Sequence, residues 1–164
     1  MEHITRGALH LAMQITGSRD EALDILQNAV VKALEYRNAP RPDDAGYKAW
    51  FYRVVHNQAV DWLRREKKFD RQAQVDEVAD EHDPESDLAM EQRKQMLHKA
   101  LDALAAEQRE IICLKDFHDF SYNDIAAIMD IERGTVMSRL HRARLALRDK
   151  LVALENESGE RDGM

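Results

Sequence analysis

The chain has 164 residues, of which 44% are hydrophobic and 34% charged, and its formal net charge at pH 7 is -7; this composition is typical of a globular, helix-rich protein. The single cysteine, Cys113, excludes a disulfide framework and a CxxC metal site, and we expect it to be a buried, unreactive thiol. No apolar run approaches the roughly 18 residues of a membrane span, and the first residues lack the charged-then-apolar order of a signal peptide, so we expect a cytoplasmic protein without direct membrane insertion.

Three amphipathic helices are predicted in the first part of the chain, over residues 3–16, 19–36 and 44–69. The second helix has an apolar stripe that we assign to the core: Ala22, Leu26, Ala29, Val30 and Ala33. Its outer face carries polar residues and one valine: Asp24, Gln27, Asn28, Val31 and Glu35. An apolar side chain among acids and amides on an outer face is a modest indication of a protein-docking surface.

The third predicted helix contains YKAWFYRVVHNQAVDWLRREKK and has two distinct faces. The apolar face consists of Phe51, Tyr52, Val55, Ala59 and Trp62. The opposite face collects Trp50, Arg53, Asn57, Val60, Asp61 and Arg64. Cations for the backbone, a flat ring for stacking and an amide for a base edge are what a single-stranded DNA surface requires. Trp50 is also placed where a tryptophan simply closes the edge of a domain, and both interpretations remain open.

The composition changes over residues 70–88. The stretch VDEVADEHDPESD, residues 75–87, contains seven acids and neither lysine nor arginine. Such a segment cannot bury a core, so we predict a flexible acidic linker between two compact helical domains. Fully extended, it would span on the order of 60 Å.

The second domain contains the pattern of a helix-turn-helix in SYNDIAAIMDIERGTVMSRL. Ser121, with Asp124 three positions later, predicts a capped start for a short helix that carries Ile125, Ala126 and Met129. A tight turn over residues 130–134 then precedes a second helix. In DNA-binding proteins with this motif, the second helix enters the major groove.

The second helix of this motif has an apolar stripe at steps of three and four: Val136, Leu140, Ala143, Leu147, Leu151 and Leu154. The opposite face presents Ser138, His141 and Arg142 to base edges, with Arg139 and Arg144 at its borders, placed for phosphates. Basic residues on a helix are usually only a solvated face. Six cations against two acids within residues 132–150 of an acidic chain, directly after helix-turn-helix spacing, favour nucleic-acid binding.

Three segments resemble the extracytoplasmic-function (ECF) sigma factors of bacterial RNA polymerase. They are ITGSRDEALDILQNAVVKAL, AWFYRVVHNQAVDWLRRE and LDALAAEQREIICLKDFHDFSYNDIAAIMDIERGTVMSRLHRARLAL. The resemblance covers residues 4–152. It implies an all-α fold of two small helical domains: a domain over 1–69 that binds core polymerase and melts the minus-ten element, and a helix-turn-helix domain over 89–155 that reads the minus-thirty-five element. Residues 70–88 would be the linker and 156–164 a disordered tail.

The resemblance also implies roles for residues of the first domain. Asp24, Gln27 and Asn28 match the motif that docks on polymerase, with Asn28 in place of the family's usual acid; Val31 shares their face. Asn57 matches the asparagine that helps to hold a base flipped from the minus-ten element, and the loop over residues 38–47 corresponds to the segment that encloses this base. Trp50, Arg53 and Arg64 complete the predicted minus-ten surface.

In the second domain, the resemblance implies a minus-thirty-five surface made of Arg133, Thr135, Met137, Ser138, Arg139, His141 and Arg142. Met137 stands where the family often has Arg or Lys, so one contact is expected to be absent. Leu145 also lies on the outward face, without an assigned role.

The function implied is that of an alternative sigma factor. Its partners would be core RNA polymerase, promoter DNA and an anti-sigma factor, and it would have no cofactor and no catalytic activity. A possible metal site in DFHDF, residues 116–120, is disfavoured because its side chains would diverge at a helix end. Two alternatives stay open. One is a stand-alone helix-turn-helix regulator, which would not need the face around Asn57; the other is a scaffold that binds only polymerase or an inhibitor, for which Arg142 would be dispensable.

Overall fold

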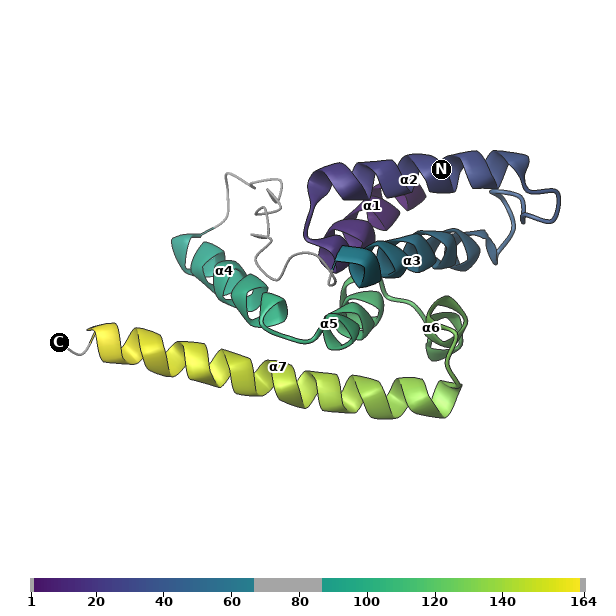
Figure 1. The fold of residues 1–164 in the computed structure, drawn as a ribbon. Coiled ribbons are helices and arrows are strands. Elements are labelled where there is room, and N and C mark those ends of the chain that lie inside the picture. The colour runs from purple at the N-terminus through teal and green to yellow at the C-terminus, as the bar shows by residue number, and fades with distance from the viewer. Residues whose placement is uncertain (1, 67–86, 163–164) are drawn as a thin grey trace.

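A computed structural model describes residues 2–66 and 87–162, and every element in these two ranges is helical (Figure 1). The elements are α1 (Glu2–Thr16), α2 (Arg19–Glu35), α3 (Tyr47–Glu66), α4 (Leu88–Asp102), α5 (Ala106–Ile112), η1 (Cys113–Phe117), α6 (Tyr122–Met129) and α7 (Arg133–Asp162). The all-α prediction is confirmed. No helix in the described ranges has a stretch long and apolar enough to cross a membrane.

Helices α1, α2 and α3 form the first half of the molecule and pack on one another. The turn between α1 and α2 follows from its sequence. Gly17 has a φ of 69°, in the left-handed region that favours glycine, and Ser18 then caps α2 by accepting a hydrogen bond from the main-chain N–H of Glu21. A sharp reversal follows, so that α2 lies back along α1 and buries Ala22, Ile25 and Ala29.

Helices α4 to α7 form the second half. The predicted cap is confirmed, because Ser121 Oγ accepts a hydrogen bond from the main-chain N–H of Asp124 at the start of α6. Asp130 ends α6 in the left-handed conformation, with a φ of 55°, and α7 begins at Arg133. This short turn gives the helix-turn-helix arrangement predicted from the sequence.

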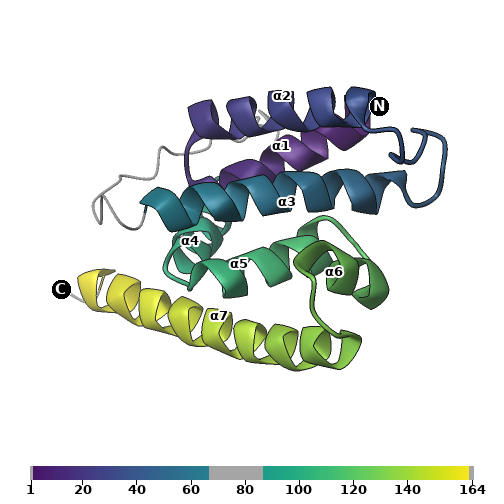
Figure 2. The ribbon, with the colours of Figure 1, turned by 45° about the vertical axis from the view of Figure 1, so that its right-hand side comes forward.

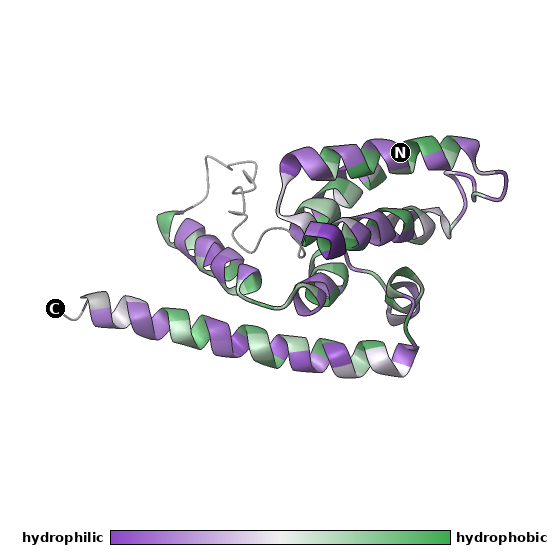
Figure 3. Ribbon diagram, in the orientation of Figure 1, coloured by the Kyte–Doolittle hydropathy of each residue, from purple (hydrophilic) through white to green (hydrophobic). Residues whose placement is uncertain are grey.

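The helices lie in layers, as the two views in Figures 1 and 2 agree. The first half forms one side, α5 and α6 lie in the middle, and α7 runs along the opposite side. The contacts between halves join α3 to α6 and α1 to α5 and η1. In Figure 3 hydrophilic and hydrophobic residues alternate along α7, as expected for a helix with one packed face.

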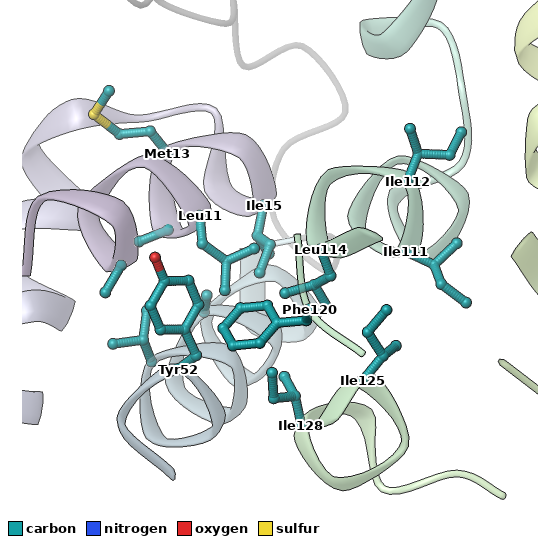
Figure 4. Close-up of a cluster of buried hydrophobic side chains, with 14 of the residues drawn as sticks. Leu11, Met13, Ile15, Tyr52, Ile111, Ile112, Leu114, Phe120, Ile125 and Ile128 are labelled. Atoms are coloured by element: carbon teal, nitrogen blue, oxygen red, sulfur yellow. The ribbon is translucent and has the colours of Figure 1, made fainter. Parts of the chain in front are cut away.

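The two halves share one continuous hydrophobic cluster, which the sequence analysis did not predict. It extends from Leu11 in α1 and Tyr52 in α3 to Ile111 in α5 and Ile125 in α6 (Figure 4). The sequence suggested two domains on a tether. The sequence left their relative arrangement open, and the structure packs the two helical halves together, with α3 contacting α6 and α1 contacting α5 and η1.

Two other boundaries differ from the predicted ones. Helix α7 continues to Asp162, whereas a tail was predicted from residue 156; glutamates and alanine favour the helix, and Gly159 alone does not end it. The predicted linker falls mostly outside the described residues. At its end, Asp87 caps α4 by accepting a hydrogen bond from the N–H of Ala89, so Leu88 belongs to the helix.

Candidate nucleic-acid and protein interfaces

The outer face of α2 is exposed as predicted. Asp24, Gln27 and Asn28 are all exposed, and Val31 is 49% exposed. The face also contains Leu34, which is 80% exposed and was not predicted as a site residue. Since Leu34 lies three positions after Val31, the helical spacing was a signal that could have identified it. An exposed apolar stripe bordered by polar residues is typical of a surface that a protein partner covers.

The outer face of α3 presents Arg53, Asn57 and Arg64 to solvent. Trp50 is partly buried, and its ring centroid lies 6.0 Å from that of Tyr47. The structure thus brings three of the four predicted residues onto one exposed face, with Trp50 at the margin of the core. An amide between two cations on an accessible helix can contact both a base edge and the flanking phosphates.

The inner face of α3 confirms the predicted apolar stripe but contains one residue that the sequence analysis missed. Phe51, Tyr52, Val55 and Ala59 are buried and Trp62 is partly buried. His56 is also buried, at 8% exposure, and its Nδ1 pairs with the carboxylate of Glu110 in α5, which is 3% exposed. This pair is separated by 54 residues in the sequence, so no local pattern could have revealed it.

The apolar stripe of α7 packs as predicted, because Val136, Leu140 and Ala143 are buried. The predicted reading residues lie on the other side of the helix. Arg133, Met137, Ser138, His141 and Arg142 are exposed, whereas Thr135 and Arg139 are partly buried. Leu145 is 45% exposed on the outer side as well.

Arg144, placed for phosphates in the sequence analysis, has an internal partner. Its Nη2 and Nε donate to the two carboxylate oxygens of Asp116, at 2.6 and 3.3 Å. The hydrogen bonds to Asp116 raise the pKa of Arg144 above its usual value. The guanidinium is therefore held against η1 rather than left free, and both side chains remain partly accessible.

A shallow pocket of about 210 Å³ lies beside the reading face of α7. Its lining combines Arg139 and Arg142 with Glu107, Gln108 and Ile111 of α5. The sequence analysis did not assign Glu107 or Gln108 to any site. Their proximity means that a carboxylate and an amide from α5 accompany two of the predicted reading residues.

A set of polar contacts joins the halves, and we call it, together with the pair His56 and Glu110, the closed interface. His118 Nε2 donates to Gln14 Oε1 at 3.1 Å, and His118 Nδ1 accepts from the Tyr52 hydroxyl at 3.4 Å. This assignment follows because a neutral imidazole has one donor and one acceptor. Arg109 Nε donates to the main-chain oxygen of Gln14 at 2.8 Å, satisfying a carbonyl in the last turn of α1.

Aromatic contacts complete the closed interface (Figure 4). The rings of Tyr52 and Phe120 meet edge to face, with centroids 4.8 Å apart. The ammonium of Lys48 lies 4.8 Å from the centroid of the Phe120 ring. Residues from α3 and from the segment after η1 therefore contact one another through two aromatic rings and through one ammonium group above a ring.

Burial changes the acid–base properties of three groups in this region. Desolvation raises the pKa of Tyr52 to about 12 and that of Cys113 to about 12. Cys113 is 1% exposed, which confirms the predicted buried, unreactive thiol. Desolvation, together with the charges of Lys48 and His10, lowers the pKa of His118 to about 4. His118 is therefore neutral in this structure at physiological pH, in agreement with its donor and acceptor contacts.

The segment DFHDF has a structural role in the described part of the chain. Asp116 bonds Arg144, whereas His118 turns toward α1 and α3. This divergence follows from the π-helical turn η1 and from Asp119, whose φ of 55° reverses the chain. Across residues 2–66 and 87–162, no three His, Cys, Asp or Glu side chains gather in a way that could hold a metal ion.

The family comparisons match both parts of the chain. Residues 1–69 match Sigma-70 region 2, and residues 94–147 match Sigma-70, region 4. The chain is similar to the ECF RNA polymerase sigma-E factor of Escherichia coli (strain K12), with 32% identity over 142 residues, covering 80% of this chain and 74% of that protein. It is also 32% identical over 149 residues to the RNA polymerase sigma factor SigV of Bacillus subtilis (strain 168), covering 87% and 82% of the two chains.

Two solved structures are similar to this fold. The first is the sigma factor RpoE from Bartonella quintana in complex with the anti-sigma factor NepR, with a TM-score of 0.71, 29% identity, and coverage of 90% of this chain and 91% of that one. The second is CnrH in complex with the cytosolic domain of CnrY, with a TM-score of 0.63, 22% identity, and coverage of 90% and 81%. The second likeness concerns the fold alone.

Proposed function

The chain belongs to the ECF RNA polymerase sigma factors, and we propose that it binds core polymerase and directs initiation from promoters with two recognition elements. The observation that supports this proposal is the presence of two separate exposed faces that combine cations with polar side chains, one on α3 and one on α7, beside the exposed face of α2 with Val31 and Leu34. The first domain, residues 1–69, docks on polymerase and stabilises the melted minus-ten element. The second, residues 89–155, anchors the duplex at the minus-thirty-five element.

The docking step uses the outer face of α2. Asp24, Gln27 and Asn28 supply polar contacts, and Val31 supplies apolar area. Leu34 extends this apolar area by one turn. We assign the core of the contact to Val31 and Leu34, because exposed apolar side chains gain most when a partner excludes water from them.

The melting step uses the outer face of α3. Asn57 accepts or donates hydrogen bonds at the edge of an unstacked base, while Arg53 and Arg64 contact the backbone. Trp50 offers a ring edge beside them. The stacking and hydrogen bonds made to the unstacked base offset the cost of unpairing, a few kcal/mol, so that the separated strands persist.

The anchoring step uses the first turns of α7 in the major groove. Ser138, His141 and Arg142 reach base edges, and Arg133, Thr135 and Arg139 position the helix on phosphates. Met137 offers an apolar contact in place of a cation. Each step is binding, so no bond is made or broken by this chain, and no cofactor takes part.

Regulation by an inhibitor protein is part of the proposal. The likeness to RpoE over 90% of this chain supports a comparable partner, because the RpoE structure holds the anti-sigma factor NepR. We assign the chain to the cytoplasm, where polymerase and promoter DNA are. The stand-alone regulator is not favoured, since it leaves the exposed faces of α2 and α3 without a purpose.

The test is transcription with purified core polymerase from a promoter library, comparing wild type with Asn57→Ala and Arg142→Ala. We expect wild type to start transcripts from a shared two-part motif. Each variant should lose initiation by roughly tenfold or more while binding core normally, because one specific base contact contributes about 1–3 kcal/mol. Arg142→Ala should also relax the preference at the upstream element.

Two exposed residues outside every proposed surface serve as matched controls: Arg93→Ala on α4 and Asn156→Ala near the end of α7. Both should initiate like wild type. If the wild-type chain neither binds core nor stimulates initiation, but shifts duplex DNA by itself, it is a conventional helix-turn-helix regulator and the proposal fails.

A further inference from the structure

The pocket between α5 and α7 contains more polar groups than the minus-thirty-five surface proposed for α7 uses. It is lined by Arg139 and Arg142 of α7 and by Glu107, Gln108 and Ile111 of α5. Only the two arginines belong to that surface. Ile111 is 1% exposed and belongs to the core, so the four polar side chains decide what the pocket can bind.

The charged side chains of the pocket are not bonded to one another. Among residues 2–66 and 87–162, neither Arg139 nor Arg142 forms an ion pair, whereas Arg144 on the same helix is bound by Asp116 at 2.6 Å. Glu107 is exposed and lines the same pocket as the two arginines. With a volume of about 210 Å³, the pocket is far larger than the space that one water molecule needs. A larger group can therefore enter between α5 and α7.

The charge and the donors of the pocket favour an anion. Two guanidinium groups against one carboxylate leave the lining with a net positive charge. The arginines and the Gln108 amide supply N–H donors. Because a planar guanidinium matches the geometry of a phosphate, a phosphate group is the anion that this lining suits best.

The position of the pocket indicates where this phosphate comes from. A helix that enters the major groove lies between two DNA strands, and its flanks meet their backbones. Arg139, which is partly buried at the border of the reading face, and the start of α5 lie together on one flank of α7. The phosphate that meets the pocket is therefore part of the promoter.

We propose that this pocket receives one backbone phosphate of the strand that borders the minus-thirty-five element, with Gln108 and Arg139 as donors and with Glu107 as the residue that limits its affinity. The inference rests on the proposed function and adds α5 to the elements that contact DNA. Arg142 contributes positive charge to the pocket, while its N–H groups reach a base edge.

The carboxylate of Glu107 gives the pocket a particular role. Every sequence carries phosphates, so an acid beside a phosphate site weakens binding to all DNA alike. Base contacts from Ser138, His141 and Arg142 are not affected by this repulsion. The chain therefore depends more on these base contacts, and on its attachment to polymerase, for a stable complex with a promoter.

The test measures the affinity of the full chain, in complex with core polymerase, for a promoter fragment that wild type selects from a library. Glu107→Gln keeps the size of the side chain and removes its charge. It should bind about 2–5-fold more tightly, on this fragment and on one with a scrambled upstream element alike. Gln108→Ala should bind both fragments about 3–10-fold more weakly, because it removes a hydrogen bond to a charged group.

Glu155→Gln is the matched control for the change in net charge. It removes one exposed carboxylate from the same half, about 20 Å along α7 from Arg142, and should bind both fragments like wild type. Glu107→Lys gives a second measure of the acid. It should steepen the dependence of the binding constant on salt by about one unit in a logarithmic plot, as an added phosphate contact does.

Neutral methylphosphonates placed one at a time along the upstream element locate the phosphate. At one flanking position the substitution should abolish both the gain of Glu107→Gln and the loss of Gln108→Ala, because the two side chains act through that charge. Thermal melts confirm that the variants are folded. If Gln108→Ala unfolds, the two variants of the exposed Glu107 carry the test.

Two results would overturn the phosphate pocket. One is unchanged affinity and salt dependence in both Glu107 variants, or no backbone position that couples to them. The other is a Glu107→Gln chain that relaxes the preference at a single base pair, as expected for Arg142→Ala, without tighter binding to the scrambled fragment. Glu107 would then orient Arg142 and would not face a phosphate.

The failure of the proposed function looks different. If wild type does not bind core or does not select a promoter from the library, the sigma function fails, and the pocket has no promoter phosphate to receive. If wild type initiates transcription from a two-part motif while the Glu107 variants behave like Glu155→Gln, the sigma function stands and the phosphate pocket is refuted.

Discussion

Helices α3 and α7 are both amphipathic and both present cations and polar groups outward, but they differ in what holds their inner faces. Helix α7 rests on apolar contacts with its own half, through Val136, Leu140 and Ala143. Helix α3 packs on its own half and on α6, and its inner face includes the buried pair of His56 with Glu110 of α5. Helix α7 is therefore held within one half, whereas α3 is held by both.

In α3, the proposed minus-ten surface and the contact with the second half lie on different sides of one helix. In α3, Asn57 faces outward while its neighbour His56 is buried against α5. Adjacent residues on a helix point about 100° apart, so one short segment serves both purposes.

The largest expected effect on stability comes from truncating a buried side chain on the apolar stripe that packs α7 against its own half. Leu140 is 2% exposed, and Leu140→Ala should destabilise the second half by about 2–5 kcal/mol through lost burial and a residual cavity. Leu145→Ala, on the same helix but 45% exposed, should change stability by less than about 0.5 kcal/mol. Urea denaturation followed by circular dichroism measures both; equal effects would mean that α7 is not held by this stripe.

A substitution that overpacks the core between α1 and α3 tests how the inner face of α3 is held. An added Cβ at Gly7 would lie 1.9 Å from the Tyr52 hydroxyl oxygen, so Gly7→Ala must displace the phenol. We expect a loss of about 1–3 kcal/mol in thermal melts, as for other overpacked cores. Combining Gly7→Ala with Tyr52→Phe should recover part of this loss by removing the hydroxyl.

Gly159→Ala is the control for Gly7→Ala, since an added Cβ at Gly159 meets nothing within 4 Å. It should leave stability unchanged or raise it slightly, through the higher helix propensity of alanine. If Gly7→Ala behaved in the same way, the close packing of α1 on Tyr52 would be wrong.

Acid should weaken the closed interface. The pKa of His118 is about 4 when it is buried, with Lys48 and His10 as its charged or titratable neighbours, and 6.5 is the usual value for an exposed histidine. The folded chain thus keeps the full contribution of the neutral His118 above pH 6.5 and loses it as pH falls toward 4, because the unfolded chain binds the proton more tightly. Between pH 7.5 and 6.0 the loss is on the order of 1 kcal/mol.

Urea denaturation at pH 7.5 and at pH 6.0 measures the effect. The free energy of unfolding should fall with pH in the wild-type chain and depend much less on pH in His118→Gln, which retains hydrogen-bonding groups without titrating. The same pH dependence in both chains would assign the effect to another group.

The smallest effect is expected for the exposed pair of Asp116 with Arg144. The two side chains are 41% and 47% exposed, so the pair should contribute no more than about 1 kcal/mol. A double-mutant cycle with Asp116→Ala and Arg144→Ala, followed by thermal melts, measures the coupling. A coupling well above this value would show that this exposed pair stabilises the second half more than its accessibility to solvent allows.

Local features of the fold were predictable because they depend on nearby residues. The caps at Ser18 and Ser121 use a hydroxyl and an N–H three positions later, so the sequence predicts them directly. The stripe of α7 follows from helical periodicity, and the same periodicity correctly predicts that Asn57 and Arg142 are exposed.

Features that depend on distant residues were not predictable in this way. Glu110 lies in the apolar run REIICLK and gives no sign that its partner is His56. The π-helical turn η1, which aims His118 at α1, likewise has no periodic signal. The packing of the two halves arises from such contacts and from the apolar cluster that they border, all between distant residues, so the sequence left the relative arrangement of the two domains open.

The most direct test of this account is energy transfer between dyes on His3→Cys in α1 and Glu155→Cys in α7, both exposed positions, while core polymerase is added. The account predicts that transfer falls from its value in the free chain to a plateau as core saturates, because reading both elements at once requires α3 and α7 to lie farther apart than they do here. If core binds and transfer stays at the value of the free chain, the halves remain packed in the complex, and reading two elements through α3 and α7 at once is contradicted.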